Sequence, residues 1–289
     1  MKIFEYNEAK QVVVCGDIHG AFETMVFKAC VQCGMTDTLI IVAGDCGFGF
    51  ERPNHYINLY NGLAGRLKKA NNWIVFVRGN HDDPSYFLEE KICYERFRCV
   101  PDYSVIQVCG LDILCVGGGV SIDRLARQRE DARYIRKETA SYWADEMPVF
   151  DEAKIEEISD YCLIDTVVTH TAPSFCPLLD KNGLRSWAAY DPQLLVDCDM
   201  ERTTMDRIYQ TLKEGGHPVN KWYYGHFHQK WIWKYENTDF KMLDIMEFAT
   251  WWRITKKRTI PFKVSYEQKV YKTPEEKIGC LVGGFCPIS

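Results

Sequence analysis

Acidic, histidine and asparagine side chains recur in five short stretches of this 289-residue chain. The stretches cover residues 16–20, 44–45, 79–82, 169–171 and 225–228, and they hold five of the 7 histidines. Each stretch follows an apolar, mostly β-branched run of the kind that forms a buried strand. Polar side chains that gather at successive strand ends predict one metal-binding cleft, built piece by piece along the chain.

The candidate metal ligands are Asp17, His19, Asp45, Asn80, His170, His226 and His228. Alternate residues of a strand share a face. This predicts that the side chains of Asp17 and His19 point toward one site, as do those of His226 and His228. Carboxylate and imidazole groups suit Mn, Fe or Zn better than Ca. With one bridging carboxylate, this set serves two ions, and two ions about 3.5–4 Å apart clamp a phosphoryl group and generate hydroxide near neutral pH. The pattern therefore points to phosphoester hydrolysis.

The composition is that of an ordinary globular protein, with 46% hydrophobic and 26% charged residues. A net charge of -5 gives no basic field that would favour nucleic acid or an anionic membrane. No apolar run approaches the roughly 20 residues that span a bilayer, and residues 1–10 lack a signal-peptide pattern. The 13 cysteines are odd in number and sit largely in apolar runs, which favours free thiols. We therefore expect a cytoplasmic protein without a membrane partner.

The elements that position the candidate ligands begin as strand–helix repeats. Strands are expected at 12–15, 39–43 and 73–77, with one helix from Phe22 to near Gly34 and another that Asn54 caps and that ends near Ala70. Such repeats predict an α/β core with right-handed crossovers. Farther along, we expect a hairpin at 104–116, a helix at 152–162, a strand at 166–168 and an irregular cap at 173–196. A helix around Met205 then precedes strands at 222–224, 231–235 and 242–246, with a turn at 236–239.

The ordered motifs D-x-H, G-D, G-N-H-D, H and G-H-x-H resemble those of the calcineurin-like metallophosphoesterase family, from Asp17 to His228. The resemblance implies an α/β fold, α+β in detail, with a central β-sandwich of two mixed sheets flanked by helices in four layers. We expect one such domain over residues 1–255, with cap or insert segments near 117–150 and 173–200. A C-terminal extension would cover 256–289. The segment 117–148 is similar to bacterial and phage members of the family.

The same resemblance implies a role for each side chain. Three ligands would hold the first ion, namely Asp17, His19 and His228. Three others would hold the second ion, namely Asn80, His170 and His226. Asp45 would bridge both ions, and His81 would bind the phosphate or protonate the leaving oxygen. The expected cofactors are two transition-metal ions, with Mn the expected choice in vitro and Fe or Zn as alternatives.

One departure from the family concerns residues 44–49, which lack the second Asp and the Arg of the G-D-x-x-D-R-G motif of phosphoprotein phosphatases. This argues against a protein serine/threonine phosphatase. It also leaves the partner of His81 open, with Asp82 and Asp83 as candidates.

Substrate contacts are less defined by the sequence than the metal ligands. The candidates among basic residues are Arg78, Arg124 and Arg127, with solvent exposure as the alternative reading. Four aromatic residues either stack on a nucleobase or pack in the core and cap, namely Phe48, Phe50, Trp187 and Tyr190.

We expect a phosphatase or phosphodiesterase that uses a metal-activated hydroxide on a phosphorylated small molecule or nucleotide. A nuclease of the same superfamily is the alternative. The arginine-rich stretch 121–137 favours it, whereas the acidic net charge does not. A catalytically silent scaffold is a third reading, and the complete set of ligands argues against it.

Overall fold

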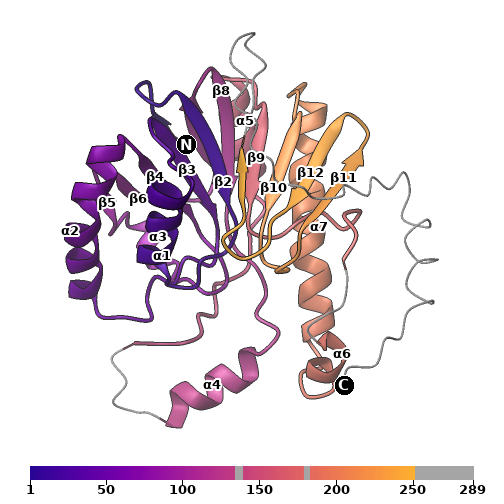
Figure 1. The fold of residues 1–289 in the computed structure, drawn as a ribbon. Helices are drawn as coiled ribbons and strands as arrows, with labels where there is room; N and C mark the ends of the chain where they lie inside the picture. The colour runs from indigo at the N-terminus through magenta and orange to yellow at the C-terminus, as the bar shows by residue number, and fades with distance from the viewer. Residues whose placement is uncertain (134–138, 179–182, 251–289) are drawn as a thin grey trace, which may run out of the picture.

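Two mixed sheets lie face to face, and helices cover both outer faces (Figure 1). The computed structural model describes residues 1–133, 139–178 and 183–250. The first sheet has the order β13-β2-β3-β4-β6-β5. Its strands are Gln11–Cys15 (β2), Thr38–Ala43 (β3), Trp73–Val77 (β4), Cys93–Tyr94 (β5), Phe97–Cys99 (β6) and Phe248–Thr250 (β13).

The second sheet has the order β1-β7-β8-β9-β10-β12-β11. Its strands are Lys2–Glu5 (β1), Ser104–Val108 (β7), Leu111–Val116 (β8), Thr166–Thr169 (β9), Lys221–Tyr224 (β10), Trp231–Tyr235 (β11) and Thr238–Met242 (β12). Strands β2, β3 and β4 run parallel in the first sheet, and β8, β9 and β10 run parallel in the second. The parallel strands of each sheet therefore end at one common edge.

Most helices cover the two outer faces of the sandwich, and two lie beyond the ends of the strands (Figure 1). The first sheet is covered by Phe22–Phe27 (α1), its continuation Lys28–Gln32 (η1), Pro53–Ala70 (α2) and Ser85–Leu88 (α3). The second is covered by Glu152–Ser159 (α5) and Leu194–Glu214 (α7). Helices Arg124–Arg133 (α4) and Leu184–Ala188 (α6) lie below the sheets in this view. In the described part of the chain, no helix is both long and apolar enough to cross a membrane.

The core has three hydrophobic layers because each buried strand points alternate side chains to opposite faces. Val13 packs with the helices of the first sheet, whereas Val12 and Val14 pack between the two sheets. On the second sheet, Val167 packs with α5 and α7, and its neighbour Val168 packs between the sheets. Helix, sheet, sheet and helix therefore form four layers, which confirms the expected sandwich. The cysteines of the described residues are free thiols, as expected.

Several expected element limits are wrong. The turn after β11 comprises only Glu236 and Asn237, with Glu236 in the left-handed region (φ 50), so β12 lies at 238–242 and not at 242–246. Helix α2 begins at Pro53 after Arg52, and Asn54 lies inside it. The cap segment 173–196, expected to be irregular, contains α6 and the start of α7. Strands β1, β5, β6 and β13 were not expected. The expected extension 256–289 lies outside the described residues.

His217, which belongs to no motif, is expected to make the stability of the fold depend on pH. Its Nδ1 accepts a hydrogen bond from the Ile164 amide at 2.9 Å, and its Nε2 lies 2.8 Å from Ser159 Oγ. Burial lowers the pKa of His217, so the folded state favours the neutral ring. A depressed folded-state pKa stabilises the protein above the unfolded-state value of about 6.5, and this contribution is lost as the pH falls below it.

We therefore expect the free energy of unfolding to fall less steeply with decreasing pH in the His217→Gln protein than in the wild type. Urea unfolding curves above and below pH 6.5 (about the pKa of a free histidine) measure the two slopes. His55→Gln removes an exposed histidine from α2 and serves as the control, with a slope like that of the wild type. Equal slopes for wild type and His217→Gln would contradict this account.

Candidate metal centre

The five motif stretches lie in the loops that follow β2, β3, β4, β9 and β10, and thus at the common edge of both sheets. Several candidate ligands have a positive φ, which is uncommon for residues other than glycine. They are His19 (φ 45), Asp45 (φ 47), His226 (φ 67) and His228 (φ 48). The chain turns sharply at these positions, so the expected alternation of strand faces does not place these side chains. The turns of the loops orient these side chains instead.

Glycines in the motifs make room for ligands that come from other strands. A Cβ atom on Gly44 would lie 2.1 Å from Nδ1 of His170, and one on Gly225 would lie 2.0 Å from Oδ1 of Asp17. Both distances are far below van der Waals contact. The glycine that precedes Asp45, and the one that precedes His226, therefore allow two motifs to approach each other closely.

The first set of candidate ligands comprises Asp17, His19, Asp45 and His228, whose donor atoms all lie within 4.8 Å of one another. Nε2 of His19 lies 2.9 Å from Nε2 of His228, which in turn lies 3.0 Å from Oδ2 of Asp17. The His226 amide donates to the Asp17 carboxylate at 3.0 Å and fixes its position. Lone pairs that converge in this way repel one another unless a cation or a proton lies between them. The donor set therefore fits one Mn, Fe or Zn ion.

The second set lies around His170, which directly follows β9, and includes Asn80 and His226. Nδ1 of His170 lies 2.8 Å from the carbonyl oxygen of Ala43 and donates to it, so the lone pair is on Nε2. That nitrogen lies 2.9 Å from Oδ1 of Asn80 and 3.1 Å from Oδ1 of Asp45. The ring of His226 lies 4.8 Å from that of His170, measured between centroids. These three side chains could hold a second cation, and Asp45 faces both sets.

The electrostatics of His170 agree with a cation site. Burial lowers the pKa of this ring, but the charge and hydrogen bond of Asp45 outweigh burial and raise the pKa to about 10. Asp45 in turn loses solvation by burial, yet the surrounding histidines hold its pKa well below the usual range. The carboxylate thus attracts a positive charge into the centre, and a metal ion would supply that charge in place of a proton.

A buried chain of hydrogen bonds sets the orientation of the Asn80 amide. Nδ2 of Asn80 donates to Oγ of Ser121 at 2.9 Å. That hydroxyl donates to Oε2 of Glu146 at 2.6 Å, and the Ser121 amide donates to Oε1 at 2.7 Å. The chain holds the amide nitrogen away from the centre and turns Oδ1 toward His170. Sequence reasoning did not single out Glu146, although it lies in the segment 117–148.

We expect the Ser121→Ala protein to bind Mn more weakly at the second set of ligands, by about tenfold, since outer-shell partners orient metal ligands. The metal-stripped protein is titrated with Mn, and binding is monitored by calorimetry and by the electron paramagnetic resonance signal of free Mn. Both methods measure the affinity without reference to activity. Ser104→Ala is the matched control, because Ser104, the first residue of β7, is equally buried (1% exposed) but donates to the Pro101 carbonyl. Unchanged Mn affinity in Ser121→Ala would show that Ser121 does not orient Asn80.

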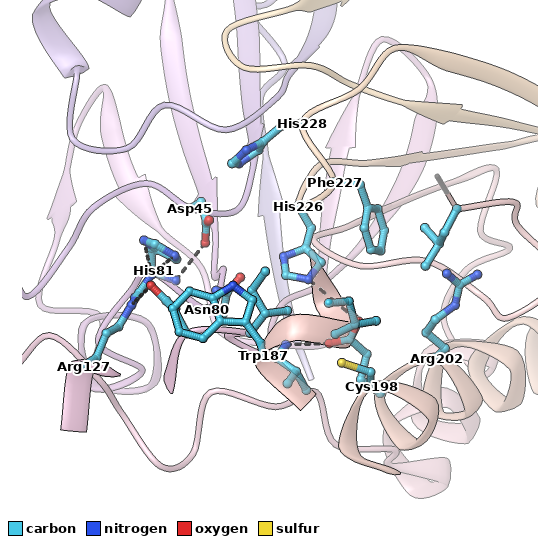
Figure 2. Close-up of a pocket in the computed structure, with 16 residues that line it drawn as sticks. Asp45, Asn80, His81, Arg127, Trp187, Cys198, Arg202, His226, Phe227 and His228 are labelled. Carbon is cyan, nitrogen blue, oxygen red and sulfur yellow. Dashed lines mark hydrogen bonds and ion pairs between the residues drawn. The ribbon is translucent and has the colours of Figure 1, made fainter. Parts of the chain in front are cut away.

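His81 lies beside the two ligand sets, and its ring contacts the guanidinium of Arg127. Its amide donates to Oδ1 of Asp45 at 2.8 Å. Its ring contacts the Arg127 guanidinium, with Nη2 of Arg127 3.2 Å from Nδ1 and also in contact with Nε2 (Figure 2). Nε of Arg127 donates to Oδ2 of Asp123 at 2.9 Å. Burial lowers the pKa of His81 to about 4, and Arg127 adds to this effect.

Asp82 and Asp83, the two candidates for the partner of His81, bind backbone amides instead. The Asp82 carboxylate is fully buried and accepts from the amides of Cys46, Gly47, Phe48 and Gly79 at 2.7–3.0 Å. Oδ1 of Asp83 accepts from the Ser85 amide at 2.9 Å. Asp82 therefore joins the loop that carries Asp45 to the loop that carries Asn80, which the sequence alone did not reveal.

The other two candidate arginines are engaged elsewhere. The Arg78 side chain is buried and donates to Oδ2 of Asp102 at 2.8 Å and to the Glu146 carbonyl at 2.7 Å. Arg124, at the start of α4, donates to Oδ2 of Asp191 at 2.6 Å and to Oδ2 of Asp197 at 2.5 Å. Arg124 thereby ties α4 to the segment that leads into α7. These contacts favour structural roles, and a substrate contact by either arginine stays a prediction.

Glu201 is a buried acid beside the second ligand set that sequence reasoning missed. Its Oε2 accepts from the Val120 amide at 2.5 Å and its Oε1 accepts from Oγ of Thr171 at 2.7 Å. Oε1 also lies 3.9 Å from Nε2 of His226. Burial raises the pKa of Glu201 to about 7. A signal was present in the sequence, because Glu201 continues the apolar stripe of α7 that includes Met205 and Ile208.

A cavity of about 400 Å³ opens onto the candidate centre (Figure 2). Four of the candidate ligands line it, namely Asp45, Asn80, His226 and His228. His81 and Arg127 lie on one flank, and Phe227 and Cys198 lie on the other. Of the aromatic residues considered for substrate stacking, Trp187 lines this cavity, whereas Phe48 is fully buried in the first sheet's core.

The family model for calcineurin-like phosphoesterases matches residues 10–230. No curated protein gives a match. Among solved structures, the chain is similar to the phosphopantetheinyl hydrolase of Mycobacterium tuberculosis, with 15% identity, a TM-score of 0.39 and coverage of 81% of this chain and 89% of that chain. GAP50, the anchor in the inner membrane complex of Plasmodium, has 12% identity, a TM-score of 0.38 and coverages of 81% and 71%. A cold-active protein-tyrosine phosphatase of Shewanella has 13% identity, a TM-score of 0.36 and coverages of 86% and 78%. Similarity at this level identifies no substrate.

Proposed function

We propose that this chain, which belongs to the calcineurin-like phosphoesterase family, hydrolyses a phosphoester bond at a two-metal centre. Family membership implies metal-dependent phosphoester hydrolysis; the number of ions and the role of each residue are our proposal. The observation that supports it is the position of Asp45, whose carboxylate lies 3.1 Å from Nε2 of His170 and 3.8 Å from Nδ1 of His19. The two sets of ligands thus share one carboxylate. The proposed ligands are Asp17, His19, Asp45, Asn80, His170, His226 and His228.

When bound, two divalent ions would lower the pKa of water and neutralise the charge of the phosphoryl oxygens. The chain's own residues would then position the substrate. Arg127 would donate from Nη2 to a phosphoryl oxygen, while Asp123 keeps the guanidinium in place. His81 contacts Arg127, and an anionic phosphoryl group beside the ring would raise the pKa of His81 from its low value. His81 would then hold a proton for the leaving oxygen.

The test is hydrolysis of a chromogenic phosphomonoester and the matching diester by metal-stripped protein, with and without added Mn, Fe or Zn. We expect turnover only with metal, and its loss on chelation. Faster turnover of the monoester would identify a phosphatase, and faster turnover of the diester would identify a phosphodiesterase. Turnover that survives chelation, or no turnover with any of the metals, would contradict the proposed function.

We expect Arg127→Ala to lower kcat/KM by about a hundredfold, as for the loss of one preorganised donor to a developing anion. A lower kcat with an unchanged KM would place the contact in the transition state. Arg129→Ala is the matched control, because Arg129 lies on the same helix and is exposed. If both variants keep wild-type kinetics, Arg127 does not bind the phosphoryl group.

A nuclease remains the alternative within the family, but the arginine-rich stretch supports it less than its composition implied. Arg124 and Arg127 in this stretch pair with carboxylates of the chain itself. Their charges are therefore partly neutralised before any nucleic acid binds. Cleavage of structured or single-stranded RNA or DNA in the presence of Mn would favour this alternative.

A further inference from the structure

The cavity beside the candidate centre has one polar end and one apolar end. The ligands described above form the polar end. The apolar part of its lining comes from the loop after β8, the cap segments and the loop after β10, and comprises Val120, Ile122, Leu178, Leu184, Trp187 and Phe227. Leu178 is 40% exposed and Trp187 is 36% exposed, so both present apolar surface that a bound molecule would cover. An alcohol esterified to a phosphoryl group at the polar end would extend along these walls.

Most charged groups of the same walls already have partners. Glu201 accepts from the Val120 amide and from Thr171, and Asp123 accepts from Nε of Arg127. Arg202 donates to the carbonyls of Pro173, Ser174 and Cys176 at 2.5–3.0 Å. A sugar or polyol in this part of the cavity would lose hydrogen bonds to water and regain few from these groups. That loss is unfavourable, whereas an apolar group gains by leaving water.

We propose that the preferred substrate is a phosphoester of an alcohol that carries a flat apolar group, and that Trp187 and Phe227 hold this group. This inference rests on the proposed function. An aromatic group packs edge-to-face or offset against other rings, which suits the Trp187 ring and the part of the Phe227 ring that Arg202, 5.9 Å from its centroid, does not cover. The volume of about 400 Å³ accommodates a phosphoryl group and a single ring system. The cap would thus select the leaving group, while the metal centre carries out the hydrolysis.

The test compares phenethyl phosphate with glycerol phosphate in the Mn-loaded protein. Both esters release a primary alcohol, so a difference in kcat/KM reports the contacts of the alcohol and not its acidity. We expect phenethyl phosphate to be preferred by about tenfold or more, and Trp187→Ala to bring the ratio of the two kcat/KM values close to one. Tyr190→Ala is the matched control, because Tyr190 is an aromatic residue of the same cap that is 75% exposed and lines a neighbouring hollow.

Leu178→Ser provides a second variant of the apolar wall, should Trp187→Ala fold poorly, and it is expected to weaken phenethyl phosphate turnover selectively. Equal kcat/KM for the two esters in the wild type would overturn the inference but leave the proposed function standing. A preference for AMP over phenethyl phosphate would overturn it as well, in favour of a nucleotide. Absence of turnover of all these esters with Mn, Fe and Zn would instead overturn the proposed function itself.

Discussion

Asp45→Asn is expected to lower kcat by about a thousandfold or more, because one substitution removes the carboxylate that both ligand sets share. Asparagine keeps the shape of the side chain but lacks its charge, and one of its two polar atoms is a donor. The Asp45 carboxylate faces His170 and His19 and also accepts from the His81 amide. Loss of its charge therefore weakens both metal positions at once.

Two measurements check this expectation. Elemental analysis of protein reconstituted with Mn should show fewer ions bound in Asp45→Asn than in the wild type, and steady-state kinetics should show the loss of kcat. Asp112→Asn is the matched control, because Asp112 is a partly buried carboxylate on β8 that accepts from Gln107 at 2.8 Å, outside the centre. Full metal content and full activity in Asp45→Asn would mean that Asp45 does not bridge the ions.

Asp82→Ala is expected to lower the free energy of unfolding by about 3–5 kcal/mol, although Asp82 belongs to neither ligand set. Its carboxylate accepts four backbone hydrogen bonds, from the amides of Cys46, Gly47, Phe48 and Gly79. Alanine would leave these buried donors without partners. Because the same bonds join the loops of Asp45 and Asn80, we also expect weaker metal binding.

Urea unfolding of the metal-free protein measures the effect on stability separately from metal binding. The matched control is Asp83→Ala, since the neighbouring carboxylate accepts only the Ser85 amide among the contacts described and should cost about 1 kcal/mol. Asp82→Asn should fall between the two, because its one remaining oxygen still accepts. Equal urea midpoints for Asp82→Ala and the wild type would contradict this role.

The strand–helix repeats and the motifs of the sequence predicted the buried strands and the candidate ligands, whereas the layers of the sandwich were implied by the resemblance of the motifs to a known family. Buried runs such as 39–43 read correctly as strands, because their apolar side chains fill the layers on both faces of a sheet. The candidate ligands follow such runs directly. The chain then has little freedom between the strand end and the ligand, so motifs far apart in sequence meet at the common edge of the sheets. Local patterns were sufficient for this part.

Local patterns were not sufficient for the rest of the site. The alternation of strand faces failed at His226 and His228, because sharp turns with positive φ aim these rings. The predicted turn after β11 was too long, because the following strand, β12, begins with polar residues that pair with β11. Both cases depend on backbone geometry that neighbouring strands impose.

Only the tertiary structure decided which groups support the ligands. Asn80 meets Ser121 across 41 positions of sequence, and the Val120 amide meets Glu201 across 81. It also assigned Arg127, and not Asp82 or Asp83, to the ring of His81. Hydrogen bonds and ion pairs need two groups within about 3–4 Å, and a linear pattern carries no such distance. The sequence therefore predicted the chemistry of the centre, and the folded chain decided how the candidate ligands are oriented and which apolar side chains line the cavity beside them.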